Sequence, residues 1–153
     1  MISPVSFLST VFFFMVAFFF QQAGVFVVHG IQPNFILVGL VFLAVRVPER
    51  KIFISFIIVL GIFILLLTPY WIQPILLMFM YAVGFYFLKD MVTGNAFFDF
   101  MVGIFLGILF LYSVTSFLNA PFIALPLLLG EIAYTFLVGV LVWFLLKKKE
   151  IIF

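Results

Sequence analysis

The stretch that decides the fold is residues 125–149, LPLLLGEIAYTFLVGVLVWFLLKKK. It is almost wholly apolar as far as the three closing lysines, and it is long enough to cross a hydrocarbon core of about 30 Å as a helix. One carboxylate, Glu131, interrupts it. A carboxylate inside a membrane is costly unless it finds a partner or reaches the interface. The stretch therefore predicts a membrane helix, and the presence of Glu131 within it requires an explanation.

The composition extends this reading to the whole chain. Of 153 residues, 69% are hydrophobic and only 8% are charged, and the mean hydropathy is +1.52. Soluble domains carry about 25% charged and 45–50% apolar residues. We expect an integral membrane protein with a single domain over residues 1–153. No basic region opens the chain, so its first apolar segment is expected to stay as a membrane helix.

Apolar runs separated by polar or proline-containing breaks predict an all-α bundle of six transmembrane helices. The runs are continuous and do not alternate, which favours helices over a barrel. The expected spans are 5–22, 33–47, 52–68, 71–88, 97–118 and 122–146. The second is short, about 22 Å at 1.5 Å per residue. We therefore expect residues 23–32 to form a half-buried or re-entrant connector, with Pro33 opening the second helix.

The basic residues predict the orientation. With the amino terminus in the cytoplasm, the breaks after the second and fourth spans and the carboxyl terminus are also cytoplasmic. These places hold all seven basic residues, and the other breaks hold none. This is the positive-inside pattern, and it predicts that both termini are cytoplasmic. The residues are Arg46, Arg50, Lys51, Lys89, Lys147, Lys148 and Lys149.

Uncharged polar residues gather in the outer half under this topology. We expect an intramembrane polar cluster, and its members are Gln21, Gln22, Gln32, Asn34, Gln73, Glu131 and Tyr134. Two interpretations of Glu131 compete, with proton or ion coupling as a third. The side chain can snorkel outward near the positive end of its helix. It can instead turn into the bundle and bond to a glutamine or tyrosine of a neighbouring helix.

Four further residues attract attention. Asp99 is expected in the first turn of the fifth helix, where the helix dipole stabilises an acid. His29 is expected to be a loop or packing residue. Gly103 and Gly107 form a GxxxG pattern, which permits close helix approach. That approach can serve packing inside the bundle or contact with a partner subunit.

Catalytic motifs are missing from the sequence. It contains no nucleophile elbow, no zinc-protease motif and no phosphate-binding loop. The lack of cysteine excludes disulfides and thiolate metal ligands. We therefore expect no enzyme, no cofactor and no metal site, and the net charge of +2 gives no case for nucleic acid.

Both ends of the chain resemble a known family. A glutamine closes the first helix (Gln21 or Gln22), GIQPNFILVGL follows at 30–40, and LLLGEIAYTFLVGVLVWFLLKKK forms the end at 127–149. These pieces resemble the MreD-type rod-shape-determining membrane proteins. The sequence departs from that family at the end of the third helix, where no acid follows Gly61.

The resemblance implies a function. It implies a non-catalytic scaffold of the bacterial cell-elongation machinery in the inner membrane, binding an MreC-like single-span partner, with MreB and peptidoglycan synthases nearby. It also implies a fold akin to the substrate-binding subunits of energy-coupling-factor vitamin transporters. A small-molecule binding subunit of a transporter is therefore the alternative. A structural subunit of another membrane complex, or a homodimer, also remains open.

Overall fold

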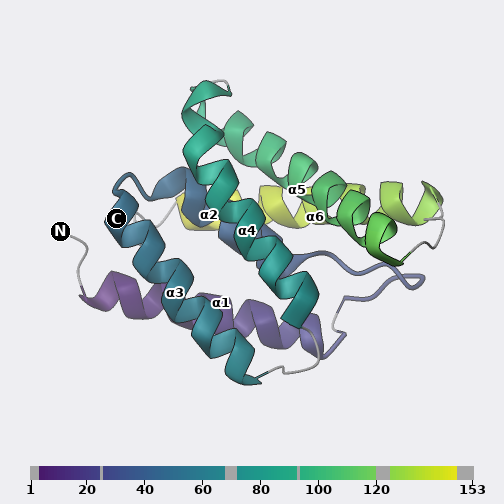
Figure 1. Ribbon diagram of the computed structural model, residues 1–153, viewed down its shortest axis with the longest axis horizontal. Helices are drawn as coiled ribbons and strands as arrows, with labels where there is room; N and C mark the ends of the chain where they lie inside the picture. Colours follow the sequence, from purple (N-terminus) through teal and green to yellow (C-terminus); the bar gives the residue numbers. More distant parts are fainter. Residues whose placement is uncertain (1–3, 25, 68–71, 93, 120–124, 148–153) are drawn as a thin grey trace.

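The computed structural model describes residues 4–24, 26–67, 72–92, 94–119 and 125–147. Within these ranges the chain is all-α, and six α-helices account for nearly all of it (Figure 1). The helices are α1 (Pro4–Gln22), α2 (Phe35–Arg46), α3 (Arg50–Leu67), α4 (Ile72–Leu88), α5 (Ala96–Asn119) and α6 (Leu125–Lys147), with a 3-10 turn η2 (Lys89–Met91) after α4. The number and order of helices agree with the prediction. The expected boundaries at Thr68, Trp71 and Phe122 lie outside the described residues.

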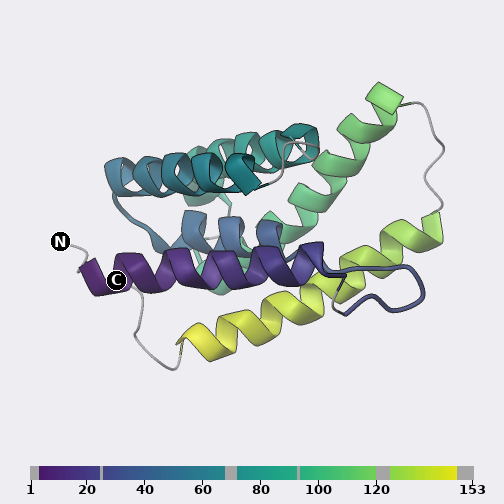
Figure 2. The same ribbon diagram turned by 90° about the horizontal axis from the view of Figure 1, so that it is seen from below.

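The short helix α2 forms the centre of the bundle. Every residue from Ile36 to Ala44 is buried, and α2 contacts α1, α4, α5 and α6. Its sequence has no polar face, which is compatible with burial on all sides by protein. In Figure 2, α2 lies between α1 and the layer formed by α3 and α4. At 12 residues, it is only about 18 Å long, so both of its ends lie among protein groups.

The segment between α1 and α2 corrects two predictions. Its described residues from 23 to 30 are exposed rather than half-buried, and only Ile31 to Asn34 enter the bundle. Asn34, not Pro33, starts the helix, since the Asn34 side chain accepts a hydrogen bond from the Leu37 N–H at 2.9 Å. Asparagine is among the best N-cap residues because its oxygen satisfies a free N–H of the first turn. We call residues 23–34 the connector.

Gly103 and Gly107 pack inside the bundle. A Cβ at Gly103 would lie 2.6 Å from Phe85 and Val41, and a Cβ at Gly107 would lie 2.8 Å from Leu37 and Tyr81. Since these neighbours belong to α2 and α4, the GxxxG face lets α5 approach the core. The alternative of a partner contact through these glycines is wrong, because no second protein can reach them. Asp99 lies in the first turn of α5, as predicted, and its side chain is buried.

The outer surface of the bundle is apolar. Large hydrophobic side chains are exposed on α1, α3, α4, α5 and α6. On α6 they include Leu125, Leu129, Leu137, Leu141 and Leu145, which we call the leucine row. With the exposed Ala133 between them these residues are spaced by four, so the row winds partway round the helix. Two helices of the described chain, over Ala96–Ser116 and Leu125–Leu145, are long and apolar enough to cross a membrane by themselves. The other apolar helices are shorter, so length and composition support two such helices rather than the six expected.

The two ends of the bundle differ in composition. α1 begins and α6 ends at one end, and the connector lies at the opposite end (Figure 2). Arg46, Arg50 and Lys89 line a common cavity, whereas the cavity beside the connector is lined by amide and carboxyl side chains. We call these the basic end and the connector end.

Candidate functional site

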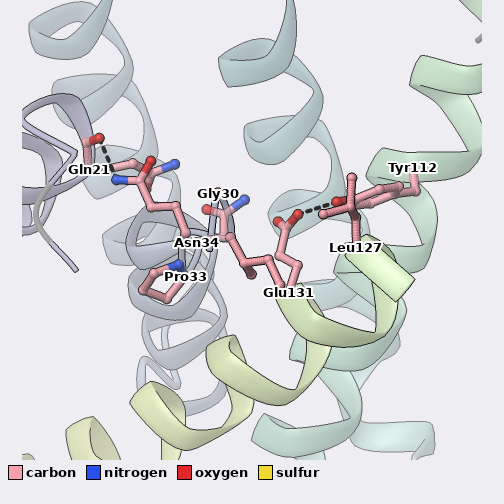
Figure 3. A pocket seen from close by; sticks show the side chains of 9 residues that line it. Gln21, Gly30, Pro33, Asn34, Tyr112, Leu127 and Glu131 are labelled. Atoms are coloured by element: carbon pink, nitrogen blue, oxygen red, sulfur yellow. Dashed lines mark hydrogen bonds between the residues drawn. The ribbon is translucent and has the colours of Figure 1, made fainter. Parts of the chain in front are cut away.

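A polar cavity of about 270 Å³ opens at the connector end, between α1, the connector, α5 and α6 (Figure 3). Its lining residues are Gln21, Gly30, Ile31, Gln32, Pro33, Asn34, Tyr112, Leu127 and Glu131. Polar groups cluster here because α2 begins in the interior. A helix start leaves N–H groups without intrahelical partners, and a buried start must find acceptors elsewhere.

Gln21 at the end of α1 provides one of these acceptors. Its Oε1 accepts a hydrogen bond from the backbone N–H of Ile36 at 3.0 Å. Its backbone oxygen accepts another from Nε2 of Gln32 at 2.6 Å. Gln21 therefore ties the end of α1 to the connector and to the first turn of α2.

Asn34 links the start of α2 to α6. While its side chain caps the helix, its backbone N–H donates to Oγ1 of Thr135 at 3.1 Å. Asn34 and Thr135 are both buried. The first turn of α2 is thus held by α1, by its own cap and by α6, and the positive end of its dipole lies beside the cavity.

Glu131 is the acidic residue of the cavity. Its Oε2 accepts a hydrogen bond from the Tyr112 hydroxyl, and Figure 3 shows both side chains directed into the space between α5 and α6. This agrees with the interpretation in which the carboxyl group turns into the bundle and bonds to a tyrosine. None of the described lining residues is basic. The lining therefore offers one carboxyl group together with amide groups, which can accept or donate hydrogen bonds.

An apolar groove of about 400 Å³ lies on the other side of the connector. Its lining residues are Val28, His29, Ile31, Gly130, Ala133, Tyr134 and Leu137. Ile31 belongs to both spaces and lies against Gly130, where a Cβ would come within 2.4 Å of its side chain. The groove is thus formed by the connector on one side and by small and large residues of α6 on the other.

The predicted polar cluster divides between these places. Gln21, Gln32, Asn34 and Glu131 line the polar cavity, whereas Tyr134 lines the apolar groove together with His29, an exposed residue of the connector. Gln22 and Gln73 are exposed and line neither space. Gln22 points away because it is one residue, or about 100°, around the helix from Gln21.

Two residues that matter were not in the predicted cluster. Tyr112 bonds to Glu131, and Thr135 bonds to the start of α2. A sequence signal existed for Thr135, which lies four residues after Glu131 and therefore on the same face of α6. Among the described residues, no group of three histidine, aspartate or glutamate side chains could hold a metal ion.

Comparison with known proteins finds no relative, since neither a family model nor a curated protein nor a solved structure matches the chain. The function must therefore be argued from the chain's own residues.

Proposed function

We propose that the chain is a multi-pass protein of the bacterial cytoplasmic membrane, with six spans and both termini in the cytoplasm. The apolar exposed surface supports this, because large exposed apolar patches in water would drive association. The position of the described basic residues at one end of the bundle also supports it. In this orientation the connector end faces outward.

Its function, in our proposal, is that of a non-catalytic scaffold that binds a single transmembrane helix of a partner along α6. The observation that carries the proposal is the leucine row beside the apolar groove. Side chains four residues apart form the ridges that pack into grooves of another helix. The small residues Gly130 and Ala133 lie at the groove, and helix contacts inside membranes favour such residues.

The polar cavity has a structural role in this proposal. Gln21 and Asn34 tie the connector to α1 and α6, and Glu131 ties α6 to α5. Ile31 of the connector lines both the polar cavity and the groove. The pairing of Tyr112 with Glu131 lacks a nucleophile and base arrangement of the kind that covalent catalysis needs. A binding role is the simplest use of the site.

The resemblance at both ends of the chain supplies the identity of the partner. We propose an MreC-like single-span protein with a periplasmic coiled coil, within the machinery that elongates the cell wall. MreB and peptidoglycan synthases would then belong to the same assembly. A bitopic partner of this type presents one apolar helix, which is the shape that the groove accommodates.

Site-specific cross-linking tests the proposal, and the absence of cysteine makes single-cysteine variants unambiguous. Ala133→Cys and Leu137→Cys, co-expressed with an MreC-like partner carrying one cysteine in its span, should form a disulfide-linked heterodimer. Ile58→Cys on α3 is the matched control, because Ile58 is equally apolar and exposed. Two outcomes would reject the proposed docking face. Either Ile58→Cys cross-links as strongly as the α6 variants, or no variant cross-links at all.

The polar cavity favours a second candidate function, binding of a small molecule for transport. Its volume is close to the lower limit of about 300 Å³ for ligand pockets. Saturable binding of a vitamin-like amine by the purified protein, abolished by Glu131→Gln and accompanied by no partner cross-link, would favour this candidate over the scaffold.

A further inference from the structure

A further cavity, at the basic end, has no part in the proposed scaffold. It is a cavity of about 410 Å³ where α2 ends, α3 begins and α4 ends. Its lining residues are Val45, Arg46, Pro48, Arg50, Tyr86, Phe87 and Lys89. Three of these are cationic, and none of the described lining residues is acidic. Like charges gathered around one space repel each other, so the arrangement favours an anion between them.

Aromatic side chains hold two of the cations in place. The Arg50 guanidinium lies 5.4 Å from the centre of the Phe87 ring, and the Lys89 Nζ lies 4.3 Å from the centre of the Tyr86 ring. Tyr86 stacks on the buried Phe53 at 4.1 Å and donates to the backbone oxygen of Pro48 at 2.9 Å. The wall of the cavity is therefore fixed before any ligand arrives, which reduces the cost of binding.

Lys89 also fixes the geometry of the backbone at this end. Its Nζ donates to the backbone oxygens of Ala44 at 2.7 Å and Val47 at 3.2 Å, at the end of α2. Cations are favourable at the negative end of a helix. The lysine charge is thereby held at a defined point of the lining rather than on a free surface chain.

Arg46 has a buried hydrogen-bond donor that no described residue satisfies. Its guanidinium lies 4.5 Å from the centre of the Trp143 ring and 5.8 Å from that of Phe42. Its Nε is buried and has no hydrogen-bond partner among the described residues. A buried donor without an acceptor is rare, because it loses water without gaining a bond.

The start of α3 adds a further attraction for anions. This 18-residue helix begins at Arg50, which is itself a lining residue. Helix starts carry partial positive charge and free N–H groups, and they bind phosphates for that reason. Glu49 stands just before the helix and is exposed, but it does not line the cavity.

We propose that this cavity binds a phosphate group that belongs to an anionic ligand. An anionic lipid headgroup and a soluble phosphate compound share this chemistry. Basic pockets between membrane helices on the cytoplasmic side bind phospholipid headgroups, and the proposed topology places the cavity on that side. The proposal needs only the cavity and its charges, so it stands or falls independently of the scaffold function.

Titration of the full-length protein in detergent tests the proposal. Phosphatidylglycerol and phosphatidylcholine are added separately, and bound lipid is counted by native mass spectrometry. Inorganic phosphate is the third probe, read by the shift in thermal unfolding temperature. Arg50→Gln should weaken phosphatidylglycerol binding about fivefold, the factor expected for one cation beside a lipid surface.

The matched control is Lys51→Gln, which removes the same charge from the next, exposed residue of α3, outside the cavity lining. It should leave binding within twofold, and Arg50→Lys, which keeps the charge, should do the same. Phosphate binding that competes with phosphatidylglycerol and is weakened only by Arg50→Gln would support a soluble ligand as the source. No binding of either probe, equal binding of the two lipids, or equal weakening by Arg50→Gln and Lys51→Gln would overturn the proposal.

Discussion

Tyr112 on α5 and Glu131 on α6 are joined by a hydrogen bond from the tyrosine hydroxyl to the carboxyl oxygen Oε2. The bond gives the acid in the second turn of an apolar helix a partner inside the protein. It also connects the two longest apolar helices of the described chain next to the start of α2. This contact between helices offsets the cost of a carboxyl group in an apolar segment.

Substitutions of Glu131 should distinguish the contribution of its hydrogen bond to stability from the contribution of its charge. A glutamine keeps an acceptor for the Tyr112 hydroxyl, whereas a leucine leaves that hydroxyl without one. We expect Glu131→Leu to lower the free energy of unfolding by about 1–3 kcal/mol, and Glu131→Gln to lower it by less than about 1 kcal/mol. Adding Tyr112→Phe to Glu131→Leu should recover part of the loss. Equal stability of the glutamine and leucine variants in detergent unfolding would contradict the pairing.

Gln21 and Gln22 form a natural matched pair. Gln21→Leu removes the acceptor of the Ile36 N–H, so unfolding should become easier by about 1–2 kcal/mol. Gln22→Leu changes an exposed side chain and should leave stability within about 0.5 kcal/mol. Thermal unfolding of the two purified variants is the measurement. A larger loss for Gln22→Leu would show that the wrong glutamine has been assigned to the start of α2.

Gly103 should tolerate no side chain. A single methyl group at this position meets Phe85 and Val41 at 2.6 Å, and overpacking of this kind costs about 1–3 kcal/mol. Gly84 on α4 is the control, because a Cβ there meets nothing within 4 Å. Gly84→Ala should be neutral or slightly stabilising, since alanine favours helices. The two alanine variants are compared by their yield of folded protein and by unfolding temperature.

Cysteine labelling in intact cells tests the orientation. His29 and Glu49 are exposed. His29 belongs to the connector, and Glu49 lies between Pro48 and Arg50, which line the cavity at the basic end. We expect His29→Cys to react with a membrane-impermeant maleimide, and Glu49→Cys to react only after permeabilisation. The cysteine-free parent chain gives the background. The reverse pattern would place the termini outside.

Much of the helix arrangement could be predicted because long apolar runs leave few alternatives. The sequence showed six helices and one basic end. It did not show that α2 would be the centre, since its apolar sequence fits burial in protein as well as contact with lipid. Burial by α1, α4, α5 and α6 is a tertiary effect, and no pattern within residues 35–46 encodes it.

The polar cluster was harder to predict for a related reason. Hydropathy indicates where a residue lies along a helix but not on which side of the helix it lies. Gln21 and Gln22 therefore looked equivalent, and Gln73 looked close to the other residues of the cluster. The GxxxG pattern likewise indicated close approach without naming the neighbour. The bulky partners Phe85 and Tyr81 lie on α4, about twenty residues earlier in the chain, and only the folded arrangement brings them to the glycines.

The anchoring of α2 at both ends has a consequence for how the protein is made. Under the proposed membrane topology, residues 35–46 enter the membrane long before Lys89 and Thr135 are synthesised, yet these two residues bond to the two ends of α2. A helix of about 18 Å cannot cross the bilayer alone with its ends satisfied. The nascent protein must therefore hold its central helix in a temporary position, beside α1 or the insertion machinery. The helix reaches its final place only when α6, which contributes Thr135, has been completed.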